Sequence, residues 1–168
     1  MKKYCSYPLS FLFYFCFGSI LVLFHGIQWM ALTAFGYGAH KKSVDILNYF
    51  ILRCLALLGT RITFEYEMPL PNQGSVIFVA NHQSTYDIPP LIWELRGYHA
   101  KFVSKKELGK GIPSVSFNIR HGGSVMIDRK KPKEALELIE SFGVRLAKSN
   151  HSVIIFPEGT RSKTGKMK

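Results

Sequence analysis

Formal charge is missing from a long stretch near the start of the chain. Between Lys3 and Lys41 there is no lysine, arginine, aspartate or glutamate. Apolar residues fill most of this gap, although four glycines interrupt it. About 20 apolar residues suffice to cross a bilayer as a helix, so the sequence predicts a membrane-embedded helix here rather than a solvated one. The next apolar run, residues 46–58, has Arg53 as its only formal charge and would form the second member of a helical pair.

A cleaved signal peptide is the alternative interpretation of this segment, because Lys2 and Lys3 resemble a basic signal start. The apolar region is longer than a usual signal core, and a second apolar run follows almost at once, so we favour a retained anchor. Lys41 and Lys42 match the first lysine pair at the other end of the gap, so charge asymmetry sets no orientation. A hairpin that dips into the cytoplasmic face of the inner or plasma membrane would suit both pairs.

Acidic residues are scarce: 11 Asp and Glu stand against 22 Lys and Arg, which gives a net charge of +11. A balance this basic favours an anionic partner. The excess is densest between Arg96 and Lys133, where ten basic residues accompany two acids. This basic belt is either a solvated face that attracts anionic lipid head groups or the source of a few cations for a phosphate site. We expect no nucleic-acid partner, because an apolar anchor would hold the domain at a membrane and no nucleic-acid motif occurs.

Cysteine is also scarce, with three residues and no CxxC pair. All three lie in or beside apolar segments, which favours simple packing roles over a disulfide framework. No pair of His or Cys residues has convincing metal-ligand spacing, so we predict no metal. Hydrophobic residues make up 47% of the chain, which excludes a disordered polar protein.

Beyond residue 60 the sequence alternates between short strand patterns and helix patterns. A period-two segment at 62–67 predicts a strand, as do apolar runs at 75–80, 101–104, 124–127 and 152–156. Residues 84–96 favour a helix. Pro132 opens another, whose apolar face would comprise Ala135, Leu138, Ile139, Phe142 and Leu146. The sequence therefore predicts an α/β fold, a largely parallel sheet with flanking helices, after an N-terminal membrane-embedded helical segment. The domains would be residues 1–60, the anchor, and 61–168, the α/β domain.

The first chemical motif is NHQSTYD, residues 81–87, which begins where the strand SVIFVA ends. Ligands of open α/β sheets bind outside the carboxyl ends of the strands. There, Asp87 could fix the tautomer of His82 and leave its other ring nitrogen free to accept a proton. The alternative is that residues 84–87 simply form a helix N-capping box, and the two roles are compatible. His40 and Asp45 repeat the spacing of the pair beside the anchor, where we assign it no function.

The second motif is FPEGTRS, residues 156–162, at the end of another buried strand. Gly159 permits close backbone approach, while Thr160 and Arg161 supply donors suited to a phosphate or oxyanion. Taken alone, this segment is equally consistent with an ordinary turn that carries a surface arginine.

Together these motifs are similar to a known family. NHQSTYD resembles the NH-x4-D motif of the glycerolipid acyltransferases, the group that includes 1-acylglycerol-3-phosphate acyltransferases. GSVMIDR, residues 123–129, resembles the second motif of that family, and FPEGTRS resembles the third. SKKEL, residues 104–108, also resembles the family sequence between the first two motifs. The motifs occur in the family's order, behind an apolar N-terminus.

The resemblance implies an acyl transfer in phospholipid biosynthesis. Lysophosphatidic acid would be the acceptor, phosphatidic acid the product, and acyl-CoA or an acyl carrier protein thioester the co-substrate, with no other cofactor. His82 would be the catalytic base and Asp87 would orient it. The remaining site residues would bind the acceptor: Arg129, Arg161 and Lys105 through its phosphate, and Glu158, Gly159 and Thr160 by shaping its site.

Two alternatives remain open at this stage. The acceptor could be a different lysolipid, because arginines suit most phosphate-bearing acceptors. Members of the family also continue past the third motif to a fourth, proline-containing one, whereas this sequence stops at Lys168. We therefore expect the α/β domain to be truncated at its C-terminus. The other interpretation is a non-catalytic, membrane-anchored remnant that binds anionic lipid.

Overall fold

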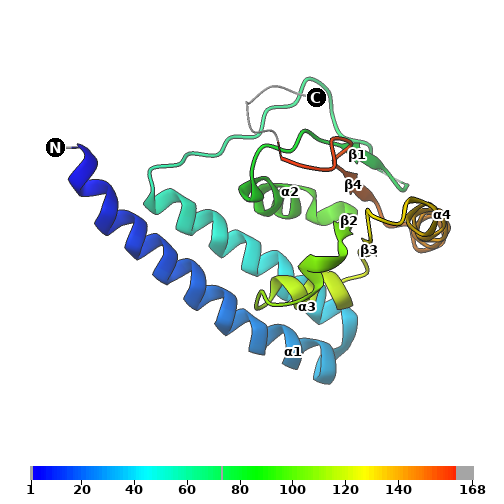
Figure 1. The fold of residues 1–168 in the computed structure, drawn as a ribbon, viewed down its shortest axis with the longest axis horizontal. Coiled ribbons are helices and arrows are strands. Elements are labelled where there is room, and N and C mark those ends of the chain that lie inside the picture. Colours follow the sequence, from blue (N-terminus) through cyan, green and yellow to red (C-terminus); the bar gives the residue numbers. More distant parts are fainter. Residues whose placement is uncertain (1, 73, 162–168) are drawn as a thin grey trace.

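The centre of the molecule is a sheet of four parallel strands (Figure 1). The computed structural model describes residues 2–72 and 74–161, with side chains from residue 7 onward. The strands are β1 (Ile77–Val79), β2 (Lys101–Lys105), β3 (Val125–Ile127) and β4 (Val153–Ile155), and their order is β1-β4-β2-β3. The predicted α/β class with a largely parallel sheet is confirmed, and so are the four strand positions from residue 75 onward.

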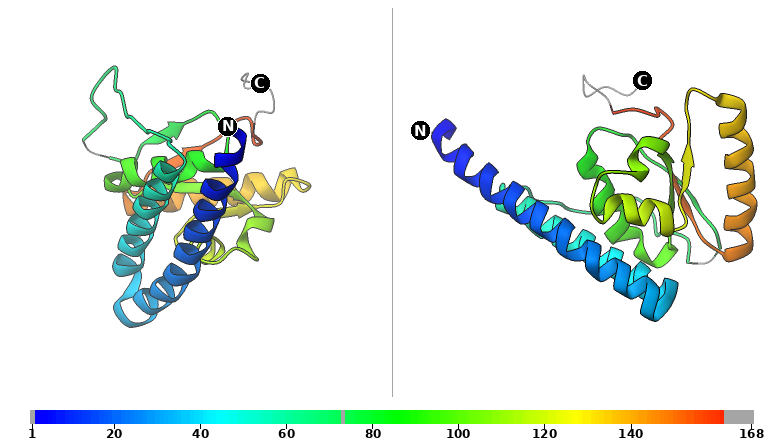
Figure 2. Two further views of the ribbon diagram at one scale, coloured as in Figure 1. Left: turned by 90° about the vertical axis from the view of Figure 1, so that its left-hand side faces the viewer. Right: turned by 60° about the horizontal axis from the view of Figure 1, so that its bottom comes forward.

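Parallel neighbours need crossover connections, and helices supply them here. The connection from β1 to β2 contains η1 (Thr85–Asp87), α2 (Ile88–Glu94) and η2 (Leu95–Tyr98). The connection from β2 to β3 contains η3 (Lys106–Gly109) and α3 (Val115–His121), and α4 (Pro132–Ser149) joins β3 to β4. Figure 2 shows α4 on one face of the sheet, with α2, α3 and the N-terminal helices on the other. The predicted helix 84–96 is therefore three consecutive short helices.

Helix α4 covers its face of the sheet with an apolar stripe. Phe142 and Leu146 form one buried cluster with Val125 of β3 and Val153 of β4. Leu138 was expected on the same face, but its side chain is 44% exposed. At about 100° per residue it lies roughly 70° from the centre of the stripe, which places it at the edge of the contact.

The N-terminal element α1 (Lys2–Leu57) consists of two helical arms that fold back on each other at Gly36. Leu21 and Phe24 of the first arm pack against Leu47 and Ile51 of the second. The expected helical pair is present, and its second arm begins well before residue 46. Cys16 and Cys54 pack in an apolar cluster between the arms, as expected, whereas Cys5 lies outside the described side chains.

The helix is long and apolar enough, from Tyr7 to Leu57, to cross a membrane. Only 17% of its most apolar window is buried inside the molecule. Aromatic side chains such as Phe11, Phe15 and Phe35 point outward, as expected of a surface that faces lipid. The division into residues 1–60 and 61–168 stays a prediction.

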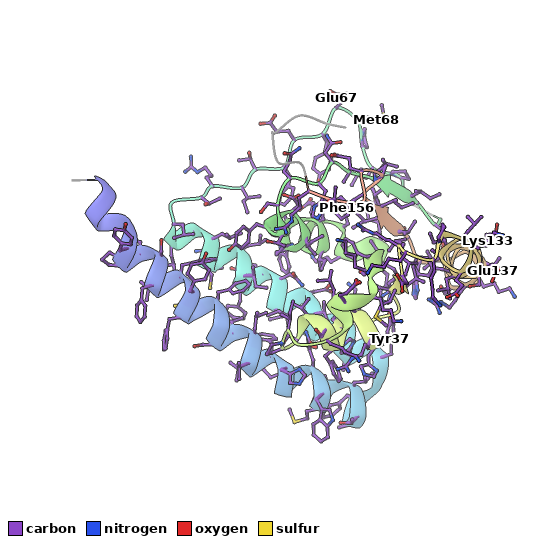
Figure 3. The ribbon with its side chains drawn as sticks, in the orientation of Figure 1. Tyr37, Glu67, Met68, Lys133, Glu137 and Phe156 are labelled. Atoms are coloured by element: carbon purple, nitrogen blue, oxygen red, sulfur yellow. The ribbon has the colours of Figure 1, made fainter. Side chains whose placement is uncertain are left out.

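The predicted strand at 62–67 is wrong. These residues form an irregular and largely exposed segment that leads from α1 to β1. Alternating hydrophobicity alone does not make a strand, which needs a hydrogen-bonded neighbour, and the sheet formed by the described residues does not include this segment. Ile62 instead packs against the α1 arms. Glu67 and Met68 stand on the outside of the molecule (Figure 3).

Gly36 allows the fold-back, because its φ of 79° and ψ of −170° suit glycine almost alone. A Cβ at this position would meet no atom within 4 Å, so Gly36→Ala tests backbone strain without steric overlap. We expect the substitution to lower the free energy of unfolding by about 1–3 kcal/mol. Denaturation of the purified protein in detergent measures the change.

Gly38→Ala is the matched control, because Gly38 is equally open and its φ is not positive. Alanine there should stabilise the helical arm by about 1 kcal/mol. Equal effects of the two substitutions would show that backbone conformation at Gly36 does not hold the turn.

Candidate active site

The sheet brings the sequence motifs to one edge. Because all four strands are parallel, their carboxyl ends lie on the same side. NHQSTYD follows β1, Lys105 ends β2, Arg129 follows β3 and FPEGTRS follows β4. Every predicted site residue therefore lies at the edge where ligands of such sheets bind. Ser162, the last residue of FPEGTRS, lies outside the described residues.

His82 and Asp87 form a direct side-chain contact at this edge. His82 Nδ1 lies 3.0 Å from Asp87 Oδ2, and the two side chains are 18% and 26% exposed. With a proton on Nδ1, the imidazole donates to the carboxylate and its Nε2 carries a lone pair. This arrangement can accept a proton from a bound hydroxyl group.

The same carboxylate also caps the helix that follows. Asp87 Oδ2 accepts hydrogen bonds of 2.8 Å from the backbone N–H groups of Gln83 and Ser84. Ser84 Oγ accepts from the backbone N–H of Tyr86 at 3.2 Å, which completes a capping box. The structure therefore contains both the capping box and the His82–Asp87 contact. The cap fixes the rotamer of Asp87, and Asp87 in turn orients the ring of His82.

Phe156 is a site residue that the sequence analysis missed. Its ring stacks on the imidazole of His82, with centroids 4.4 Å apart and planes 30° apart. The contact arises because β1 and β4 are neighbours, and the backbone N–H of Ala80 donates to the carbonyl of Ile155 just beyond the strands. Phe156 is the first residue of FPEGTRS, but the motif did not reveal the partner of its ring.

Arg129 lies against the loop of the third motif. Its Nη1 donates to the carbonyl of Gly159, so the residues after β3 and β4 are joined across β2. Gly159 has a φ of 62°, and a Cβ there would lie 3.6 Å from Arg129 Nη1. Glycine thus provides the left-handed turn that presents its carbonyl to the guanidinium group.

Glu158 has two buried carboxylate oxygens, and neither has a hydrogen-bond partner among the residues that the structure describes. Removing a carboxylate from water without donors is costly, so these oxygens are free to accept hydrogen bonds at this edge. Lys105, Thr160 and Arg161 are exposed at the same edge. Among residues 2–72 and 74–161, no cluster of three or more His, Cys, Asp or Glu side chains is placed to hold a metal ion.

The comparison with protein families agrees with the order of the motifs. Residues 61–168 match the family model described as Acyltransferase. The chain belongs to the acyltransferase family. The resemblance expected from the three motifs is therefore confirmed.

Individual relatives of this acyltransferase chain point to one group. It is 25% identical to human 1-acyl-sn-glycerol-3-phosphate acyltransferase alpha over 164 residues, which are 98% of this chain and 57% of the relative. It is 38% identical to the Helicobacter pylori 1-acyl-sn-glycerol-3-phosphate acyltransferase over 95 residues, 55% of this chain and 38% of the relative. The chain thus spans little more than half the length of the mammalian relatives that it matches.

A solved structure shows the same arrangement. The crystal structure of the 1-acyl-sn-glycerophosphate (LPA) acyltransferase PlsC from Thermotoga maritima superimposes with a TM-score of 0.76 at 26% identity. The match covers 100% of this chain and 66% of that chain. The parallel sheet and its flanking helices are therefore those of an acyltransferase.

Proposed function

We propose that this protein transfers a fatty acyl group from an acyl thioester to the free hydroxyl of lysophosphatidic acid and so forms phosphatidic acid. The observation that carries the proposal is the 3.0 Å contact of His82 Nδ1 with Asp87 Oδ2 at the carboxyl edge of the sheet. The names of the relatives support this acceptor, and a reaction in phospholipid biosynthesis is part of the same proposal.

The reaction follows from the tautomer of His82. Nε2 takes the proton of the acceptor hydroxyl, and the hydroxyl oxygen attacks the thioester carbonyl carbon. The new C–O bond forms as the C–S bond breaks, and the thiolate that leaves takes the proton back from His82. No acyl-enzyme forms. Asp87 holds the imidazole in orientation and stabilises the imidazolium between the two proton transfers.

The acceptor is proposed to lie between His82 and the loop after β4. Arg161 and Lys105 are exposed cations that can pair with its phosphate group. Glu158 would accept a hydrogen bond from a hydroxyl of the acceptor, which satisfies one of its two buried oxygens. Arg129, expected as a phosphate ligand, would act mainly by holding the Gly159 turn, because one of its N–H groups is already used there.

A lipid substrate fits the surroundings of the pair. Tyr86, between Ser84 and Asp87, packs against Phe13 and Phe17 of α1 with ring centroids 5.9 and 6.5 Å apart. The first motif therefore touches the arm whose other side is apolar and exposed. We propose that α1 holds the site at a membrane surface, on the cytoplasmic face, where both lysolipid and acyl-CoA or acyl carrier protein are within reach.

The test is acyl transfer by membranes that contain the protein, with acyl-CoA as donor and either lysophosphatidic acid or lysophosphatidylcholine as acceptor. We expect phosphatidic acid to form and lysophosphatidylcholine to react poorly. A preference for lysophosphatidylcholine would assign the enzyme another lysolipid. The absence of transfer to both acceptors, with acyl-CoA and with acyl carrier protein donors, would favour the lipid-binding interpretation.

Phe156→Ala is expected to lower kcat about 2- to 10-fold, with little change in KM for the acceptor. The reason is that a stacked aromatic contact contributes about 0.5–1.5 kcal/mol to holding the imidazole in place. Phe156→Tyr keeps the ring and should retain most of the activity. Steady-state kinetics on equal amounts of folded protein measure both variants, and equal losses in Ala and Tyr variants would contradict the positioning role.

A further inference from the structure

A polar pocket lies at the edge of the sheet opposite the candidate active site, where the turn of α1 meets the start of β2. Its cavity measures about 40 Å³. Tyr37, His40 and Asp45 of α1 line one side, and His99 and Lys101 line the other. Lys101 begins β2 and Lys105 ends it, so the pocket is about 13 Å of strand away from the candidate active site. Figure 3 shows Tyr37 at this end and Phe156 at the other.

Lys101 is a buried cation with no carboxylate bound to it. Its side chain is 5% exposed, and Nζ donates to Tyr37 Oη at 2.5 Å, while Tyr37 donates to the Gly122 carbonyl at 3.0 Å. Burial lowers the pKa of Lys101 to about 8, so most molecules carry this charge at neutral pH. Asp45, the acidic residue of the pocket wall, is already bound to Lys41 Nζ at 2.5 Å. The positive charge therefore faces the cavity without a counter-ion of its own.

Two histidines add hydrogen-bond donors to the same cavity. His40 is fully buried, and neither of its ring nitrogens has a hydrogen-bond partner among the described residues. Nε2 of His99 is likewise buried without one, and burial lowers the pKa of His99 to about 3, which keeps the ring neutral. Each imidazole carries at least one N–H group. These groups need an acceptor that the surrounding protein does not supply.

The turn of α1 adds partial positive charge beside the same cavity. The second arm starts after Gly36, so the peptide N–H groups of its first turn, which contains Tyr37 and His40, have no partners within the helix. A helix N-terminus carries partial positive charge and favours anions. The charged wall residues of the pocket are Lys41, Arg96 and Lys101 against Asp45, which leaves an excess of two positive charges.

We propose that this pocket binds a phosphate group, supplied either by free phosphate or by the head group of an anionic lipid. The cavity has room for about three water molecules, which is close to the size of one tetrahedral oxyanion. Phosphate oxygens would accept from Lys101 Nζ and from the N–H groups of His40 and His99. A lipid source is chemically reasonable because the α1 arms beside the pocket are apolar and exposed, and free phosphate presents the same oxygens to the pocket. The inference is independent of the proposed acyl transfer.

The test for free phosphate is thermal unfolding of the full chain in neutral detergent, with inorganic phosphate against sodium chloride of equal ionic strength. Phosphate at about 100 times its Kd should raise Tm by about 5–10 °C. Lys101→Met should lose this increment, because methionine keeps an unbranched apolar side chain and removes the charge. Lys42→Met changes an exposed lysine of α1 that does not line the pocket, and this variant should retain the increment. Equal increments in wild type and Lys101→Met would overturn the proposal.

His40→Phe keeps the aromatic contact with Phe117 and removes both ring nitrogens, so it tests the pocket without deleting charge. This variant should show a reduced increment. In wild type the increment should weaken as the pH rises beyond about 8, because Lys101 then loses its proton. An increment that is unchanged in His40→Phe and at pH 9.5 would contradict the assignment.

The lipid source is tested with vesicles of phosphatidylcholine alone or mixed with phosphatidylglycerol, in phosphate-free buffer. A rise in Tm that needs phosphatidylglycerol and Lys101 identifies a lipid head group as the ligand. A rise with inorganic phosphate alone identifies a soluble anion. If neither ligand protects wild type more than Lys101→Met, the pocket is not a phosphate site.

Discussion

Replacing His82 with alanine is expected to lower acyl transfer to lysophosphatidic acid by about 10²–10⁴-fold, the range typical of a lost general base. The loss should appear in kcat, because the imidazole acts on the hydroxyl proton rather than on the phosphate of the acceptor. The fold should survive, since the side chain lies at the end of a strand and is partly exposed. Initial rates of phosphatidic acid formation by membranes with equal amounts of each variant measure the effect.

His121→Ala is the matched control for this experiment. His121 ends α3, is exposed, and belongs to none of the strand ends at which the motifs lie. We expect its rate to remain near that of wild type. Equal rates for wild type and His82→Ala would refute the assignment of His82 as the base, whatever the acceptor.

Asp87→Ala is expected to lower kcat by on the order of 10²-fold or more, because His82 loses both its orientation and the charge that stabilises the imidazolium. The same substitution removes the acceptor of the Gln83 and Ser84 N–H groups, so it should also cost about 1 kcal/mol of unfolding free energy. Rates and denaturation curves of the same preparation separate the two effects.

Ser84→Ala and Asp87→Asn are the controls for Asp87→Ala. Ser84→Ala removes the other half of the capping box and should lower stability to a similar extent while leaving kcat within a few-fold of wild type. The kcat of Asp87→Asn should lie between those of Ser84→Ala and Asp87→Ala. The reason is that one amide oxygen can still accept the three hydrogen bonds that Oδ2 accepts now. If Ser84→Ala loses as much activity as Asp87→Ala, the carboxylate acts only as a cap.

The spacing of the first motif shows how much the sequence could predict. His82 and Asp87 are five residues apart in a turn that leads into a helix, and the side chains meet. His40 and Asp45 have the same spacing inside a continuous helix, where five residues correspond to about 140° of rotation. There Asp45 bonds Lys41, and His40 has no partner among the described residues. The position at a strand end, rather than the spacing, distinguishes the pair whose side chains meet.

Other features depend on contacts that sequence patterns do not encode. The stacking of Phe156 on His82 needs β4 to lie next to β1, and this strand order is set by packing between residues more than 70 positions apart. Lys101 was counted as one member of a basic belt. Only the fold shows that it is buried beside Tyr37 instead of solvated. The strand expected at 62–67 failed for the same reason, since pairing decides whether an alternating segment becomes part of a sheet.

The break at Gly36 also determines how long each helical arm of α1 is. As one straight helix, the apolar segment from Tyr7 to Leu57 would be about 75 Å long, more than twice the hydrocarbon thickness of a bilayer. Divided at one glycine, the second arm alone is about 30 Å long, which matches that thickness. The two arms run back toward a common end (Figure 1), so the apolar surface of α1 is divided between two shorter, adjacent helices beside the α/β domain.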